Sequence, residues 1–207
     1  MPDIDVPELP FPLAASADGI WSLTSDGITG TAPARTDIFI DPGADRTADP
    51  NAGVTLNAPT LLGTPAGDEW QLSAQVSVQF ASTFDAGVLL LWADASHWAK
   101  LCFEYAPDGE PMIVSVVCDG AADDANAFVL DTAETWLRIS RTGRAVAFHA
   151  SDDGSHWKLI RHFALPLTDM PYKVGFEVQS PTGDGCAVRF RSIRFSATRL
   201  ADLRDGS

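Results

Sequence analysis

The sequence predicts an all-β protein, a two-sheet antiparallel jelly-roll sandwich. Short apolar segments recur along most of its 207 residues, and each one ends in Gly, Pro, Asp or Ser, which is typical of strands joined by tight turns. No helical periodicity longer than two turns occurs. About a dozen strands in a chain of this length favour two curved sheets over a small immunoglobulin-like sandwich. We expect one domain spanning residues 1–207.

The N-terminal part of the chain predicts an arm, one strand and a long excursion. Residues 1–20 combine Pro, Asp and Ser with short apolar patches, as expected of an arm that pairs with a sheet edge. Thr36–Ile40, TDIFI, predicts a short strand. Residues 41–69 hold many turn formers and one clear apolar patch, so we expect an irregular excursion, and loops of that length are commonly functional.

Regular alternation begins at Trp70. In WQLSAQVSVQF, residues 70–80, apolar residues alternate with Gln and Ser, which predicts one buried and one wet face. Residues 85–120 are apolar except at ADAS and APDGE, so they predict three consecutive strands. The later strand-like segments are ETWLRISRTG, RAVAFHASDDG, HWKLIRHFAL, PYKVGFEVQSPTG and GCAVRFRSIRFSA. The alternation assigns these residues to the core: Leu72, Val76, Val88, Leu101, Phe103, Val116, Leu137, Phe176 and Phe190.

The charge balance argues against two classes of partner. The chain has 14 basic and 28 acidic residues, and its net charge of −14 repels phosphate backbones and anionic lipid head groups. We therefore expect neither nucleic acid nor membrane as a partner. The N-terminus carries acids and prolines where a secretory signal needs a basic region and an apolar core, and no 18-residue apolar stretch occurs. We expect a soluble, cytoplasmic protein.

The cysteines and the common motifs predict no cofactor. Cys102, Cys118 and Cys186 show no C-x-x-C spacing, so we expect three buried, reduced thiols and neither a zinc site nor a disulfide scaffold. The sequence has no HExxH, GxSxG, phosphate-binding loop or dinucleotide fingerprint.

Lys100 and Glu104 stand out because they lie in the middle of a very apolar strand. Side chains alternate with a period of two, so both residues share one face with Trp98 and Cys102. An unpaired buried charge costs several kcal/mol, so this face must meet solvent, a cleft or charged partners. Other strands offer such partners in Arg138, His149, Glu177 and Gln179. We predict that Lys100, Glu104, Arg138 and Glu177 form one charge network on a shared polar face.

A second group of polar residues lies in CDGAADDAN, residues 118–126. Asp119, Asp123, Asp124 and Asn126 supply hard oxygen atoms of the kind that hold Ca²⁺. Their spacing does not follow the D-x-[DN]-x-[DN]-G pattern, so a solvated acidic loop without a metal is the better interpretation.

Six sequence blocks in order resemble a known family. They are TDIFIDP, NAPTLLG, FDAGVLLLWADASHWAKLCFE, IVSVVCDGAADDANAF, WLRISRTGRAVAFHASDDGSHW and VGFEVQSPTGDGCAVRF. The chain resembles small proteins of unassigned function in the concanavalin A-like lectin/glucanase superfamily, related to fungal regulation-of-enolase proteins. The resemblance implies a concanavalin A-like jelly roll with a concave polar face, and no particular reaction. The chain departs from the family pattern at Ala122, where a serine is expected.

These observations favour a non-catalytic module that binds a carbohydrate or a sugar-like metabolite on the concave face, where aromatic rings stack on sugars and polar groups take hydroxyls. The candidate ligand-binding residues are Trp98, Lys100, Glu104, Asp124, Asn126, Arg138, His149, Glu177 and Gln179.

Two alternatives remain open. One is a glycoside hydrolase-like enzyme whose carboxyl pair is Glu104 and Glu177. Laminarinase-like members of the superfamily take their acids from one strand as E-x-D-x-E, whereas LCFEYAP offers a single acid. The other is a regulatory module that binds a protein partner through residues 41–69 and its acidic surface.

Overall fold

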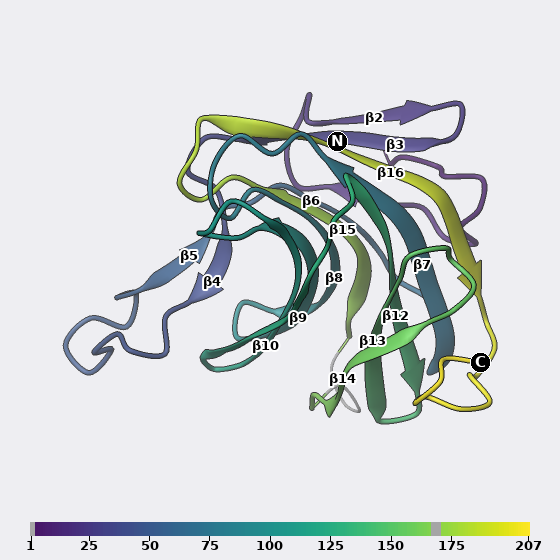
Figure 1. Cartoon of the computed structure of the whole chain (residues 1–207). Coiled ribbons are helices and arrows are strands. Elements are labelled where there is room, and N and C mark those ends of the chain that lie inside the picture. Colours follow the sequence, from purple (N-terminus) through teal and green to yellow (C-terminus); the bar gives the residue numbers. More distant parts are fainter. Residues whose placement is uncertain (1–2, 167–170) are drawn as a thin grey trace.

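The computed structural model describes residues 3–166 and 171–207, and this part of the chain forms two large antiparallel sheets and contains no helix. The sheet that curls around β4 and β5 in Figure 1 is called the inner sheet, and the other is called the outer sheet. In spatial order the inner sheet consists of β1 (Ala14–Ala15), β6 (Thr60–Gly63), β15 (Lys173–Gln179), β8 (Ala86–Asp94), β9 (His97–Tyr105), β10 (Pro111–Asp119) and β11 (Ala122–Val129).

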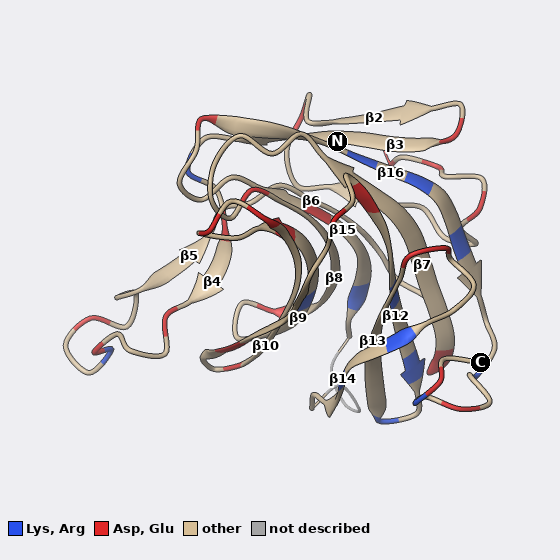
Figure 2. Cartoon of the chain, in the orientation of Figure 1, with Lys and Arg blue, Asp and Glu red and all other residues tan. Residues whose placement is uncertain are grey.

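The outer sheet has seven strands as well, and its strands β12 and β16 carry basic residues (Figure 2). In spatial order they are β14 (Lys158–Ala164), β13 (Ala145–Ser151), β12 (Glu134–Thr142), β7 (Glu69–Val78), β16 (Gly185–Ser196), β3 (Gly27–Pro33) and β2 (Trp21–Thr24). A separate hairpin is made by β4 (Ile38–Ile40) and β5 (Val54–Leu56). The expected all-β, two-sheet jelly-roll sandwich is confirmed.

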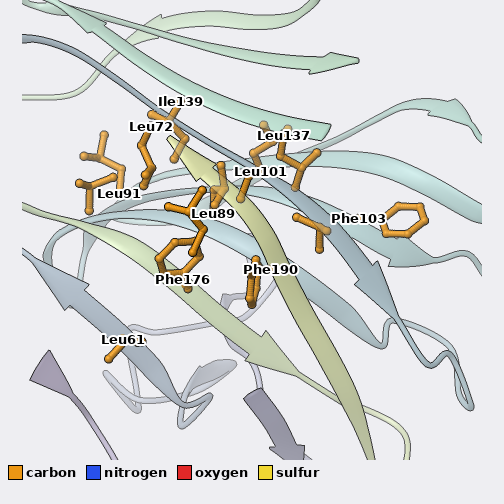
Figure 3. Close-up of a cluster of buried hydrophobic side chains, with 14 of the residues drawn as sticks. Leu61, Leu72, Leu89, Leu91, Leu101, Phe103, Leu137, Ile139, Phe176 and Phe190 are labelled. Carbon is orange, nitrogen blue, oxygen red and sulfur yellow. The ribbon is translucent and has the colours of Figure 1, made fainter. Parts of the chain in front are cut away.

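The main core lies between the two sheets. Apolar side chains of the inner sheet, such as Leu101 and Phe176, pack against those of the outer sheet, such as Leu137 and Phe190 (Figure 3). Each of these four side chains is fully buried. Burying one large apolar side chain stabilises a fold by about 1.5 to 3 kcal/mol, so this layer holds the sandwich together.

A second apolar cluster covers the opposite face of the inner sheet. There Ile38 and Ile40 of the β4–β5 hairpin pack with Val88, Leu90 and Trp98. The hairpin therefore lies across the concave side of the inner sheet (Figure 1). All nine residues predicted for the core are buried, but Val88 and Val116 belong to this second cluster and not to the layer between the sheets.

The chain between residues 41 and 69 is more regular than the sequence predicts. It contains β5 and β6, and β7 already begins at Glu69. β6 pairs with both β1 and β15, so it is an integral strand of the inner sheet. The pairing of β6 with β15 is close, because a Cβ atom on Gly175 would lie 2.2 Å from the carbonyl oxygen of Leu61. A four-residue strand is too short for its periodicity to be recognised among turn residues.

Three other local expectations have different outcomes: two are confirmed and one is mostly wrong. The three strands predicted within residues 85–120 are β8, β9 and β10, and Gly109 closes the turn between the last two with a φ of 81°. The expectation of a loop at residues 118–126 is wrong for most of these residues, because β10 ends at Asp119 and β11 begins at Ala122 and pairs with β10. The three cysteines are free and buried, as predicted.

Candidate functional site

The candidate site lies on the concave face of the inner sheet, beside the β4–β5 hairpin. Along β9, Leu101 and Phe103 enter the main core, whereas Trp98 and Cys102 belong to the second cluster. The face that the alternation assigns to Trp98, Lys100, Cys102 and Glu104 is therefore the concave one. β8 separates β9 from β15, and Ala86 on β8 is opposite Glu104 on one side and Gln179 on the other.

Lys100 is held by a set of oxygen atoms. Its ammonium donates hydrogen bonds to Asp37 Oδ1 at 3.0 Å and to Gln179 Oε1 at 2.9 Å, and it lies 4.0 Å from Glu177 Oε1. It also sits 5.7 Å from the ring centre of Trp98. Burial works against the charged form of Lys100. Glu177, which is ionised above about pH 8, and Asp37 outweigh burial and raise the pKa of Lys100. Lys100 is therefore a fixed cation.

Two buried carboxyl groups accompany this cation. Burial raises the pKa of Glu177 to about 8 in spite of the nearby Lys100, and neither carboxyl oxygen has a hydrogen-bond partner among the described residues. Burial likewise raises the pKa of Glu104 to about 8. Asp124 on β11 is exposed at the pocket, and the loss of part of its solvent contact raises its pKa. Both glutamates are therefore mainly protonated at neutral pH.

A pocket of about 300 Å³ opens above these groups and is called the Lys100 pocket. Its polar lining combines one ammonium with three carboxyl groups, one amide and one hydroxyl. Two aromatic side chains contribute to the lining, Phe39 from β4 and Phe84 from the loop before β8. Phe84 has a φ of 70°, an uncommon conformation for a residue with a side chain. The full lining is Asp37, Phe39, Phe84, Lys100, Glu104, Val116, Asp124, Gln179, Pro181 and Thr182.

Four of the sequence-predicted ligand-binding residues line this pocket: Lys100, Glu104, Asp124 and Gln179. Trp98 and Glu177 lie on the same face but are fully buried and do not line it. Asn126 projects from β11 at an exposed position opposite Val114. Among the described residues no group of three or more His, Cys, Asp or Glu side chains is placed to hold a metal ion.

Arg138 and His149 do not belong to this site. They are paired with each other on β12 and β13 of the outer sheet. There the guanidinium Nη2 of Arg138 donates to Gly206 O at 2.7 Å, and His149 Nε2 donates to Leu203 O at 2.7 Å. The predicted network of Lys100, Glu104, Arg138 and Glu177 is therefore wrong for Arg138, whereas the other three residues share the concave face. Periodicity shows which residues of one strand share a face, but it does not show which sheet the strand joins.

Sequence reasoning missed six of the ten lining residues, and Asp37, Phe39 and Phe84 are the three that matter most for the chemistry of the pocket. In TDIFI, Asp37 and Phe39 alternate with Ile38 and Ile40. This alternation puts Asp37 and Phe39 on one face and the two isoleucines on the other, but it does not show which part of the protein each face meets. Phe84 lies in a turn segment and carries no such signal.

Solved structures with the same fold have low sequence identity to this chain. A functionally unknown protein of Saccharomyces cerevisiae has a TM-score of 0.78 and 21% identity, over 89% of this chain and 96% of that chain. The GH43 protein BlXynB of Bacillus licheniformis has a TM-score of 0.68 and 14% identity, over 90% of this chain but only 36% of that chain. The carbohydrate-binding module CBM66 of Bacillus subtilis has a TM-score of 0.52 and 16% identity, over 86% and 92%.

Identities this low show a shared fold and nothing more. No curated protein matches the sequence. Within the described residues no helix is long and apolar enough to cross a membrane. A family model described as "Protein of unknown function (DUF1349)" matches residues 16–198, so the chain belongs to this family.

Proposed function

We propose that this protein is a non-catalytic binding module that holds one neutral sugar unit in the Lys100 pocket. The observation that carries this proposal is the lining, in which hydrogen-bonding groups face a space of about 300 Å³ and two phenylalanines contribute apolar surface. Aromatic rings cover the apolar faces of sugars, and fixed polar groups take their hydroxyls. The likeness to a structure named as a carbohydrate-binding module supports the same class of ligand.

The hairpin limits the ligand to a single unit or to the end of a chain. Ile38 and Ile40 are buried against the concave face, so β4 prevents a longer ligand in the Lys100 pocket from extending along the sheet. The charge of the pocket limits it further. Three carboxyl groups line it, and its lysine is already bound to Asp37 and Gln179, so a carboxylated or phosphorylated sugar is disfavoured.

An enzyme using Glu104 and Glu177 has less support. Glycoside hydrolysis needs one protonated and one ionised carboxyl on either side of the scissile bond. Glu177 is fully buried and does not line the pocket. Burial also raises the pKa of Glu104 to about 8, so neither glutamate supplies the ionised group at neutral pH.

A regulatory protein-binding role has less support too. The described exposed large apolar side chains are Leu23, Phe84 and Val129, which come from three separate segments and form no continuous patch along one element. The relation to regulation-of-enolase proteins and the cytoplasmic location stay proposals from the sequence.

The test is a calorimetric titration with a panel of neutral monosaccharides and their linear oligomers. Asp124→Ala should weaken the binding of a sugar found in this panel about tenfold or more, because it removes a hydrogen-bond acceptor from the pocket lining. Asp108→Ala, at the exposed β9–β10 turn, is the matched control and should bind as the wild type does. Oligomers should bind no tighter than the unit that fills the pocket. Failure of every neutral sugar, or equal affinity of both variants, would overturn the proposal.

A further inference from the structure

A second cavity opens on the concave side of the inner sheet. It has a volume of about 470 Å³ and is called the Lys173 pocket. Consecutive residues at the start of β4 line the two pockets, since Ile38 lines the Lys173 pocket whereas Asp37, just before the strand, and Phe39 line the Lys100 pocket. Its described lining consists of Ala14, Ala15, Ser16, Ala17, Ile38, Leu56, Asn57, Ala58, Pro59, Thr60, Leu62, Trp92 and Lys173.

The charge of this lining is opposite to that of the Lys100 pocket. Lys173 is the only ionisable side chain among its described lining residues, in a chain with twice as many acids as bases. Lys173 is exposed and makes no ion pair within the described residues, unlike Lys100 and Lys158. Its ammonium is therefore available to an anion.

The remaining lining offers an aromatic ring and polar groups. Trp92 is half-buried and lies directly opposite Lys173 in the register of β8 and β15. Ser16 Oγ accepts a hydrogen bond from the backbone N–H of Thr60 at 2.8 Å, which leaves its hydroxyl hydrogen free to donate. Asn57 is fixed at both ends, because its Oδ1 accepts from Asp37 N and its Nδ2 donates to Arg35 O. The wall is therefore preorganised.

We infer that the Lys173 pocket binds a uronic acid, that is, a sugar ring carrying one carboxylate. Lys173 pairs with the carboxylate, Trp92 covers one face of the ring, and Ser16 and Asn57 take hydroxyl groups. A simple fatty or aromatic acid would make no use of the Ser16 hydroxyl and the Asn57 amide, whereas a neutral sugar would leave Lys173 unused. This site is separate from the Lys100 pocket and does not depend on the function proposed for it.

The experiment is a calorimetric titration of the full chain with glucuronate and galacturonate, with glucose and galactose as uncharged counterparts, at low and at moderate salt. We expect saturable binding of at least one uronate below about 20 mM, weaker at higher salt, and at least about tenfold weaker binding of its uncharged counterpart.

Lys173→Met should reduce uronate affinity about tenfold or more. Lys158→Met is the matched control, since Lys158 is exposed and lies on the outer sheet. This control and Asp124→Ala in the other pocket should leave uronate binding unchanged. Lys173→Arg should retain most of the affinity, which separates loss of charge from damage to the fold. No saturable uronate binding, equal binding of the uncharged sugar, or an unaffected Lys173→Met variant would overturn the inference.

Discussion

Glu177 shows how one buried side chain sets the electrostatics of the concave face. It is fully buried on β15, two residues from Gln179, and its carboxyl oxygens find no hydrogen-bond donor among the described residues. A carboxylate in such a place is costly, so the group keeps its proton to about pH 8. The close ion-pair partner of Lys100 is therefore Asp37, at 3.0 Å.

The first prediction concerns the dependence of stability on pH. The pKa of Glu177 is raised from 4.5 to about 8 on folding, so its stabilising contribution is complete below about pH 4.5 and is lost as the pH rises through 8. Glu104 acts in the same direction. The free energy of unfolding should fall by a few kcal/mol between pH 5 and pH 9, since one pKa unit corresponds to about 1.4 kcal/mol.

Glu177→Gln should flatten this fall, and the double variant with Glu104→Gln should flatten it further. Urea denaturation at several pH values measures the effect, with Asp108→Asn as the exposed control. If all these proteins lose stability in parallel, neither glutamate is protonated at neutral pH.

The second prediction separates the two acids near Lys100. Asp37→Asn removes the ionised partner of a buried ammonium and should cost about 1 to 3 kcal/mol of unfolding free energy at pH 6. Glu104→Gln should cost less than about 0.5 kcal/mol there, because a protonated carboxyl and an amide are similar. Equal costs in chemical denaturation would mean that Glu104 compensates Lys100 as much as Asp37 does, and a larger cost of Glu104→Gln would make Glu104 the main partner.

At the scale of elements, the sequence predicts which residues form a strand and share a face better than it predicts the position of that strand in a sheet. The alternation in β9 correctly assigns Lys100 and Glu104 to one face, because that property is local. The partners of β12 and the position of β4 depend on contacts between distant segments. The sequence prediction therefore puts Arg138 on the wrong sheet and misses Asp37 and Phe39 as site residues.

The third prediction concerns the β4–β5 hairpin as a unit. Ile38 is buried in the second apolar cluster, so Ile38→Ala should cost about 2 to 4 kcal/mol and should loosen the hairpin from the inner sheet. Hydrogen exchange should then quicken first at the amide of Asp37, which is bonded to Asn57 Oδ1. Phe39→Ala, at a half-buried position on the same strand, is the control and should cost less. Uniform exchange changes across both sheets would show that the hairpin does not move separately.

At the scale of the whole molecule, two seven-stranded sheets share one core and bury all three thiols. The prediction of a β sandwich succeeds because many strands repeat the same alternating pattern. An error in one strand therefore does not change the predicted fold class. Site prediction has no such redundancy, because each pocket depends on a few side chains from separate strands.

The fourth prediction uses the three thiols as reporters of the main core and of the second apolar cluster. Cys102 and Cys118 belong to the second cluster, and Cys186 belongs to the main core. Burial raises the pKa of each thiol, so all three should react slowly with a thiol reagent in the folded protein and all should react in denaturant. The three rates should rise together with urea if the two clusters unfold as one unit. Early reaction of Cys118 alone would show that the concave face opens first.

The strand order also bears on how the protein avoids self-association. Unpaired sheet edges are templates for another chain, and two of the four edges here, β1 and β2, are only two and four residues long. The long edge strand β11 carries Asp123 and Asp124 at exposed positions. Two copies meeting antiparallel at this edge would bring these like charges close together. Arg161 of β14 donates to Asp123 O and pairs with the Asp123 carboxylate, so part of this edge is already covered, and the charge of Asp124 disfavours pairing of the rest with a second copy.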